Sequence, residues 1–177
     1  YDVNIMNGRR NTARSAKEIM ALLNPSHVIL GPGPGWPEDS PLTMEFAKMA
    51  LAGELPPTLG ICLGHQALGI ADGWGLIPSP SGPVHGIPVE CLHNGRGLFV
   101  NLSEINMTRY NSLTLLSSDD HANSQFHIDA TDATKSLVLA IRSEAHPVFG
   151  VQFHPESVGS QSGTLILDAF LNFQAHG

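Results

Sequence analysis

The stretch Thr58-Leu-Gly-Ile-Cys-Leu-Gly-His-Gln66 decides the fold. Its opening four residues predict a buried strand, and the residues after the cysteine predict a helix that continues to Ala71. Cys62 therefore stands at the turn between them, with Gly60 and Gly64 two positions to either side. Such a sharp turn strains the backbone and pushes the central side chain into the open, and a Cβ at either glycine would collide with the neighbouring chain.

A thiol at this turn has two chemical advantages. The positive end of the helix dipole favours the thiolate of Cys62, and the N–H of Leu63 points to where the oxyanion of an acyl intermediate forms. The G-x-C-x-G pattern is short, however. An ordinary strand end with Cys62 as a small core residue fits the same spacing.

The rest of the chain alternates short apolar runs with amphipathic stretches. This pattern predicts an α/β fold with an open, mostly parallel sheet and helices on both faces. Residues 75–116 are rich in glycine and proline, which predicts extra antiparallel strands in the middle of the chain. Further strands are expected at residues 3–6, 27–30, 125–131, 137–142 and 148–153, and helices at 12–23 with Thr12 as cap, from Pro41, and at 163–174.

Length and composition bound the function. The chain has 177 residues, 42% of them hydrophobic and 14% charged, which suits a single domain over residues 1–177. A net charge of −7 argues against a nucleic-acid binder. No apolar run is long enough for a membrane span, and no signal peptide is visible. Two cysteines are too few for a disulfide scaffold, so a cytoplasmic location is expected.

The segment Val151-Gln-Phe-His-Pro-Glu156 supplies a base and a partner for it. His154 comes at the end of an apolar strand, and Glu156 follows two residues later, on the same side of an extended chain. A thiol nucleophile needs a base, and the base needs a group that fixes its tautomer. A strand end with a solvated histidine and glutamate is the plainer alternative, since such residues are common near loops.

Gly31-Pro-Gly-Pro-Gly35, here called the glycine–proline loop, follows another predicted strand. It should therefore lie at the same edge of the sheet as Cys62. The prolines remove two donors and leave the N–H groups of Gly33 and Gly35 free, which suits an oxyanion hole or a carboxylate site. A rigid surface turn would have the same sequence.

Five segments between residues 31 and 157 occur together in one order. They are Gly31-Pro-Gly-Pro-Gly-Trp-Pro37, Gly60-Ile-Cys-Leu-Gly-His-Gln-Ala-Leu-Gly69, His85-Gly86, Thr108-Arg-Tyr-Asn-Ser-Leu113 and Gly150-Val-Gln-Phe-His-Pro-Glu-Ser157. This combination closely resembles the class I (triad-type) glutamine amidotransferases. Within them it is most similar to the glutaminase components of anthranilate synthase and aminodeoxychorismate synthase, which have a flavodoxin-like fold.

The resemblance implies a role for each matching residue. Cys62 is expected to form a γ-glutamyl thioester, with His154 as general base and acid and Glu156 orienting it. The backbone amides of Gly33 and Leu63 would form the oxyanion hole. The residues expected to hold the α-amino and α-carboxylate groups of L-glutamine are Gly35, Gln66, Ser112 and Leu113. Ammonia would pass to a chorismate-using synthase, and that partner, not this domain, would use Mg²⁺. No metal or cofactor is expected here.

Three departures from the family pattern stand out. The family opens with a strand, an acidic turn and a helix that nothing before Val3 supplies, so a central strand is expected to be missing. Ile87 stands where the family usually has lysine, and Asn111 where it usually has histidine. Two other functions remain open: a γ-glutamyl hydrolase or peptidase on the same fold, and a regulatory domain that retains the triad without activity.

Overall fold

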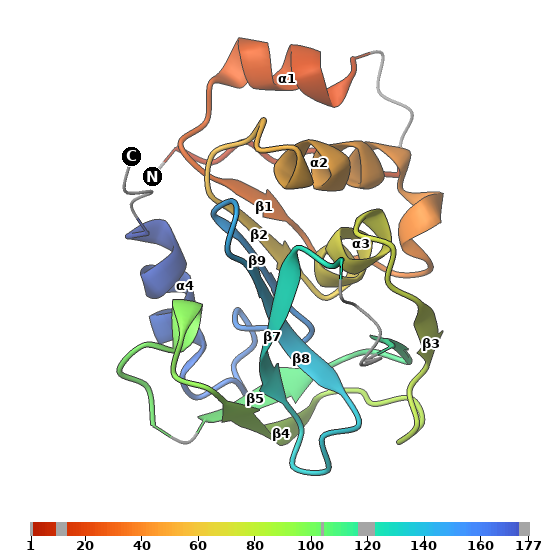
Figure 1. Cartoon of the computed structure of the whole chain (residues 1–177), viewed down its shortest axis with the longest axis vertical. Helices are drawn as coiled ribbons and strands as arrows, with labels where there is room; N and C mark the ends of the chain where they lie inside the picture. The colour runs from red at the N-terminus through yellow and green to blue at the C-terminus, as the bar shows by residue number, and fades with distance from the viewer. Residues whose placement is uncertain (1, 10–13, 104, 117–122, 174–177) are drawn as a thin grey trace.

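The computed structural model of the chain describes residues 2–9, 14–103, 105–116 and 123–173, and Figure 1 shows their arrangement. Helices and strands alternate along the chain as an α/β fold requires. The helices are α1 (Ala16–Leu23), α2 (Pro41–Leu51), α3 (Leu63–Ala71) and α4 (Gly163–Leu171), with 3-10 turns η1 (Pro37–Asp39) and η2 (Gly97–Phe99). The strands are β1 (Val28–Leu30), β2 (Thr58–Ile61), β3 (Leu76–Pro78), β4 (Ile87–His93), β5 (Ile105–Arg109), β6 (Leu113–Leu115), β7 (Phe126–Thr131), β8 (Val138–Ser143) and β9 (Val148–Val151).

The main sheet has the strand order β1-β2-β9-β8-β7-β4-β5. Strands β1 and β2, and β2 and β9, pair in parallel, whereas the other described pairings in this sheet are antiparallel. The α/β class is therefore confirmed, but the sheet is mixed rather than mostly parallel. Cys62 follows β2, which belongs to the parallel part. Neighbouring parallel strands end at the same edge of a sheet, so the residues after β1, β2 and β9 meet there.

Apolar side chains pack on both faces of the sheet. Helices α1, α2 and α3 cover one face, and α4 covers the other together with η2 (Figure 1). On the α4 side, Leu59 and Ile61 of β2 join Ile166 and Phe170 of α4 in one buried cluster. Alternation along the strands sends other side chains to the opposite cluster, for example Leu30 of β1. The expectation of helices on both faces is confirmed.

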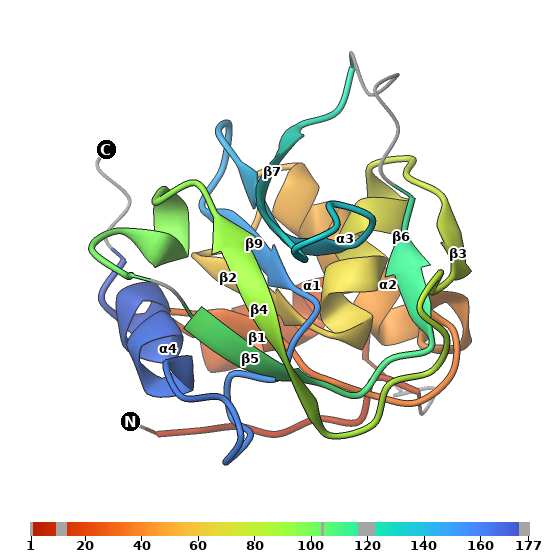
Figure 2. The same cartoon turned by 90° about the horizontal axis from the view of Figure 1, so that it is seen from below.

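The middle of the chain adds the antiparallel strands that its composition predicts. Strands β4 and β5 pair over Ile87↔Arg109 to Cys91↔Ile105 and form one edge of the main sheet. Strands β3 and β6 form a separate two-stranded sheet, which lies beside α3 in Figure 2. The strands expected at residues 125–131 and 137–142 are confirmed as β7 and β8, which pair antiparallel.

Two predictions near the N-terminus fare differently. No strand forms at residues 3–6, where Val3 is 76% exposed and Ile5 is 91% exposed. That prediction is wrong because an apolar alternation makes a strand only where a partner strand and a buried face exist. The proposed cap Thr12 lies outside the described residues. Helix α1 begins at Ala16, after Ser15, which forms a capping box with Glu18.

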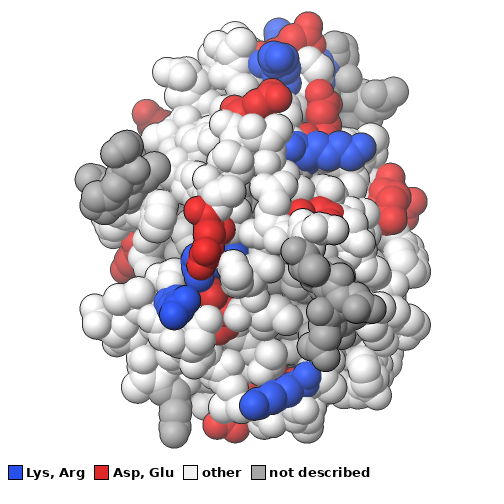
Figure 3. Space-filling model, viewed as in Figure 1, with Lys and Arg blue, Asp and Glu red and all other residues white. Residues whose placement is uncertain are grey.

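Charged side chains are sparse on the face shown in Figure 3. Acidic and basic groups are interspersed there, and most of the visible surface is uncharged. Within the described residues, no helix is both long and apolar enough to cross a membrane.

Candidate active site

Cys62 lies at the turn between β2 and α3, with φ 52° and ψ −100°. This left-handed backbone conformation costs a non-glycine residue about 1–3 kcal/mol and persists only where the surrounding structure enforces it. Two hydrogen bonds do so here. The N–H of Cys62 donates to the Val151 carbonyl at 2.8 Å, and its carbonyl accepts the first helical bond from Gln66 at 3.1 Å.

The two flanking glycines have the steric role that the sequence predicts. A Cβ on Gly60 would lie 2.6 Å from the carbonyl carbon of Gly64, and one on Gly64 would lie 2.8 Å from the Cβ of Leu30. The turn is therefore closed tightly against β1 and against itself. The Cys62 residue is nevertheless only 7% exposed, so the expectation of an open side chain is wrong. It lies at the margin of the apolar cluster on the α4 side.

His154 follows the end of β9, the parallel neighbour of β2. Its N–H donates to the Thr108 carbonyl at 2.9 Å, and its carbonyl accepts from Ser160 Oγ at 2.6 Å. The same Ser160 oxygen accepts from the Thr108 N–H at 3.0 Å. These bonds tie the backbone of His154 to the end of β5. Since β2 and β9 are adjacent, the ring of His154 reaches the thiol of Cys62.

The His154 ring lies between the thiol and a carboxylate. Its Nδ1 is 2.7 Å from Oε1 of Glu156, as their separation of two residues predicts. Burial alone would lower the pKa of His154, but its interactions with the nearby Cys62 thiol and with the Glu156 carboxylate outweigh this and raise the pKa to about 9. Burial would likewise raise the pKa of Glu156, and the bond from His154 reverses this and lowers it. The three groups thus form an electrostatically coupled set.

The glycine–proline loop lies against this turn. A Cβ on Gly33 would be 3.0 Å from Cδ2 of Leu63, so the two proposed oxyanion donors are neighbours. Gly35 has φ +81°, which favours glycine. The Arg9 guanidinium packs on Gly35 and donates to the Pro34 carbonyl, so a cation from the N-terminal segment covers one part of the loop.

The other expected substrate residues lie close together but differ in exposure. Ser112 is exposed and Leu113 is partly buried. Gln66 is 3% exposed. Its Nε2 donates to the Leu113 carbonyl at 3.2 Å and to Oε1 of Gln152 at 2.9 Å. The amide nitrogen of Gln66 is therefore already engaged within the protein.

Sequence reasoning missed three residues around His154. The Tyr110 ring packs edge-to-face on the His154 ring, with centroids 5.0 Å apart and planes at 77°. Thr108 and Ser160 hold the backbone of His154, as described above. Tyr110 and Thr108 belong to the motif Thr108-Arg-Tyr-Asn-Ser-Leu113, but the sequence indicated no role for either of them. Nothing distinguishes Ser160 from any other loop serine in the sequence.

His65 is the other histidine near the cysteine, and it points away from the triad. It is fully buried, and its ring faces β9, where a Cβ on Gly150 would lie 2.8 Å from its Nδ1. Burial lowers the pKa of His65 to about 3. The ring is therefore neutral at ordinary pH and plays no part in proton transfer at Cys62.

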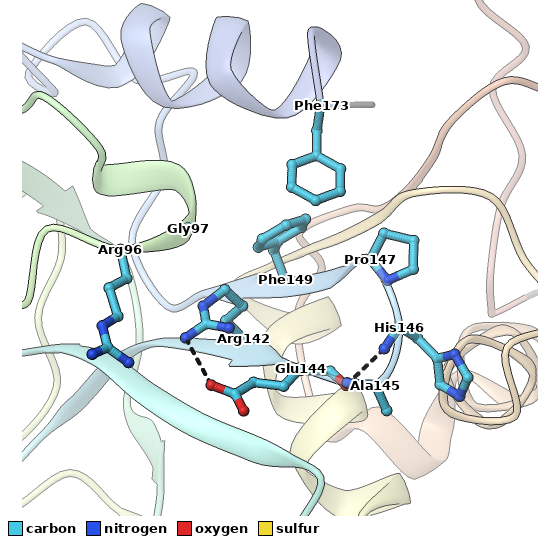
Figure 4. Close-up of a pocket in the computed structure, with 10 residues that line it drawn as sticks. Arg96, Gly97, Arg142, Glu144, Ala145, His146, Pro147, Phe149 and Phe173 are labelled. Atoms are coloured by element: carbon cyan, nitrogen blue, oxygen red, sulfur yellow. Dashed lines mark hydrogen bonds and ion pairs between the residues drawn. The ribbon is translucent and has the colours of Figure 1, made fainter. Parts of the chain in front are cut away.

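A hollow of about 560 Å³ lies near the start of β9, at the opposite end of that strand from His154 (Figure 4). The rings of Phe149 and Phe173 form one wall. Arg142 contacts Asp129 at 3.0 Å and Glu144 at 3.7 Å, so its charge is already balanced. The described residues contain no cluster of three or more histidine, cysteine, aspartate or glutamate side chains suited to a metal.

Comparison with known proteins gives one consistent family. The family model "Glutamine amidotransferase class-I" matches residues 3–173. Anthranilate synthase component 2 of Azospirillum brasilense is 36% identical over 166 residues, which are 93% of this chain and 81% of that protein. Aminodeoxychorismate synthase component 2 of Serratia marcescens is 40% identical over 154 residues, or 85% of this chain and 78% of that protein.

Two further comparisons concern length and fold. The bifunctional protein TrpGD of Thermotoga maritima is 36% identical over 153 residues, which are 85% of this chain but only 25% of that protein. The crystal structure of a putative GMP synthase protein from Thermoplasma acidophilum superposes with a TM-score of 0.73 at 21% identity. That match covers 89% of this chain and 75% of the other. It shows a shared fold.

Proposed function

Because this chain belongs to the class-I glutamine amidotransferase family, we propose that it hydrolyses L-glutamine through a cysteine thioester and supplies ammonia to a chorismate-using synthase. Cys62 is the nucleophile, His154 the general base and acid, and Glu156 the group that orients His154. The coupled thiol, imidazole and carboxylate at one edge of parallel strands are the observation that carries this proposal.

The first half-reaction forms the thioester. His154 takes the proton of the Cys62 thiol, the sulfur attacks the side-chain carbonyl carbon of glutamine, and the carbonyl oxygen becomes an oxyanion. The backbone N–H groups of Gly33 and Leu63 stabilise this charge. When the C–N bond breaks, the imidazolium of His154 gives its proton to the departing ammonia. A raised His154 pKa supports this step, because it keeps the ring protonated until the proton is needed.

The second half-reaction releases glutamate. His154 removes a proton from a water molecule that attacks the thioester, and the thiolate leaves. Gly35, Gln66, Ser112 and Leu113 hold the amino acid end of the substrate throughout. Acyl transfer through a thiol needs no cofactor, so we assign none to this chain. The Mg²⁺ expected for the reaction belongs to the synthase. A thiolate nucleophile also suits the reducing conditions of the cytoplasm.

The choice of partner follows from the relatives. Those at 36% and 40% identity carry the names anthranilate synthase component 2 and aminodeoxychorismate synthase component 2. Both names describe components of enzymes that act on chorismate. A chorismate-using synthase, as a separate chain or as part of a longer polypeptide, is therefore the proposed recipient of the ammonia.

The test separates ammonia supply from synthesis. Cys62→Ser should abolish glutamine-dependent synthesis by the complex and leave ammonia-dependent synthesis nearly intact, because only acyl transfer needs the thiolate. Formation of aromatic amine is measured with glutamine and then with an ammonium salt. Loss of both activities would count against this division of labour.

Two further assays distinguish the other candidate functions. A γ-glutamyl hydrolase would cleave γ-glutamyl peptides as well as glutamine, and a synthase would not stimulate it. A catalytically silent domain would form no thioester, and Cys62 would not react with a glutamine-like electrophile such as 6-diazo-5-oxonorleucine. Either result in the intact complex would replace the proposed function.

A further inference from the structure

A chain of buried polar groups connects the strand end at Arg109 with the helix that carries the nucleophile. Nε of Arg109 donates to Oδ1 of Asn111 at 3.0 Å, and Nδ2 of Asn111 donates to the Leu113 carbonyl at 2.7 Å. The same carbonyl accepts from Gln66 at 3.2 Å, and Gln66 also donates to Gln152 at 2.9 Å. We call these five residues the corner network.

The corner network is held away from water. Arg109, Asn111, Gln66 and Gln152 are 2%, 4%, 3% and 0% exposed. Burial makes each bond costly to break, since a buried polar group that loses its partner has no water to replace it. Nη2 of Arg109 and Nε2 of Gln152 are already buried without a hydrogen-bond partner among the described residues. Breaking a bond of the network would therefore add further buried polar groups without partners.

Asn111 occupies the middle of the corner network and uses both ends of its amide. It accepts from a guanidinium and donates to a carbonyl two residues further on. Its own backbone carbonyl accepts from the Val84 N–H at 3.1 Å. The segment between Arg109 and Leu113 is thus fixed from inside, and Ser112 is left exposed at its tip.

We propose that Asn111 is a positioning residue for glutamine: it fixes the peptide groups of Ser112 and Leu113 in the conformation that holds the amino acid end of the substrate. The inference rests on the proposed function and adds a residue to it. Asn111 acts through the segment and not on the reacting atoms. Its loss should therefore weaken substrate binding much more than the chemical step.

The required chemistry is one acceptor and one donor at fixed positions. A neutral histidine also offers one of each, whereas an aspartate offers only acceptors and a protonated histidine only donors. A charged histidine would in addition face the Arg109 guanidinium. The nearby titratable groups that bear on this point are Arg109 itself, Asp132 and Cys91, which interact with it electrostatically, and His85 beside Val84. Asparagine thus keeps the segment insensitive to pH.

Three substitutions at this position test the inference in the full-length protein. Asn111→Asp keeps the acceptor for Arg109 but sets a carboxylate oxygen against the Leu113 carbonyl, so KM for glutamine should rise about tenfold while kcat changes less than about threefold. Asn111→Leu loses both bonds, so KM for glutamine should rise at least as much. Asn111→His should keep KM within about twofold at pH 8 and raise it about fivefold at pH 6.

The matched control is Asn106→His, which adds a histidine at an exposed position of β5, the strand that precedes Asn111. It should leave the pH dependence of KM like that of the wild type. An unchanged KM in Asn111→Asp, or a KM in Asn111→His that varies with pH no more than in this control, would overturn the inference. A fall in kcat at constant KM would do so as well, because it would point to the chemical step.

A measurement without substrate keeps the inference separate from the proposed function. In Asn111→Asp, amide hydrogen exchange should speed up in residues 112–114 and stay unchanged in α4. Failure of the wild type to hydrolyse glutamine would count against the proposed function alone. Unchanged exchange in residues 112–114 would count against the inference alone. If Asn111→Asp and Asn111→Leu do not fold, the Asn111→His comparison between the two pH values decides.

Discussion

Replacing Glu156 by glutamine tests the electrostatics of the triad. Oε1 of Glu156 lies 2.7 Å from Nδ1 of His154, but 45% of the Glu156 side chain is exposed, against 13% of the His154 side chain. A hydrogen bond to a charged group contributes about 1.5–3 kcal/mol, and solvent screening reduces this at a half-exposed carboxylate. We expect Glu156→Gln to lose about 1–2 kcal/mol of transition-state stabilisation, or roughly 5–30-fold in kcat/KM for glutamine.

The pH dependence of kcat/KM should shift in a definite direction when the Glu156 charge is removed. The His154 pKa is raised to about 9, and the imidazolium that protonates ammonia is present below that pH and lost as the pH rises through it. Removing the Glu156 charge lowers this pKa toward the ordinary value of 6.5. The high-pH limb of kcat/KM should therefore move to lower pH in Glu156→Gln.

Glutamine hydrolysis between about pH 6 and about pH 10 measures both the size and the position of the change. Glu156→Asp is the matched control, since it keeps the charge and shortens its reach. Two results would refute the reasoning. One is a high-pH limb that stays in place in Glu156→Gln, and the other is a loss as large as that of Cys62→Ser.

Three other perturbations probe the turn, the buried histidine and the loop. Gly64→Ala should destabilise the fold by about 3 kcal/mol in urea unfolding, because its Cβ would collide with Leu30, whereas Gly31→Ala, with nothing within 4 Å, should change little; equal effects would contradict this. The His65 ring should not titrate above about pH 4 by NMR, since its pKa is lowered to about 3. Because the unfolded chain binds that proton more readily, stability should fall by up to about 1.4 kcal/mol per unit as the pH drops from 6.5 toward 3, and ordinary titration near 6.5 would disprove the burial. Arg9→Ala should raise KM for glutamine about 3-fold, because the exposed guanidinium of Arg9 attracts the substrate carboxylate only weakly. The effect should shrink in high salt. An unchanged KM would remove Arg9 from the site.

The strand, cysteine and helix around Cys62 could be predicted because their causes are local. Gly60 and Gly64 are required by contacts within a few residues and with the adjacent strand, and their spacing shows this in the sequence. Strand direction has no such local signature. The apolar runs at residues 126–131 and 138–143 look alike whether they pair in parallel or antiparallel, so the sequence did not show how much of the sheet would be antiparallel.

Some contacts of the site could likewise be predicted from the sequence, and others could not. The pairing of His154 with Glu156 follows from a separation of two residues in an extended chain. The approach of His154 to Cys62 does not follow from spacing, since 92 residues separate them in the sequence and only the strand order brings them together. The supports supplied by Thr108 and Ser160 are backbone and hydroxyl contacts of ordinary residues, and no pattern in the sequence identifies them.

The hydrogen bonds between β2 and β9 set how far apart Cys62 and His154 stand, because these residues follow the ends of the two paired strands. Thr108 at the end of β5 and Ser160 also hold the backbone of His154, so segments that contact neither could diverge without altering the reactive distance. Insertions in loops between β3 and β8 that spare Thr108 would change the surroundings of the site while these contacts stay the same. The pairing of β2 with β9 and the bonds to Thr108 and Ser160 are thus the contacts that the reactive geometry requires.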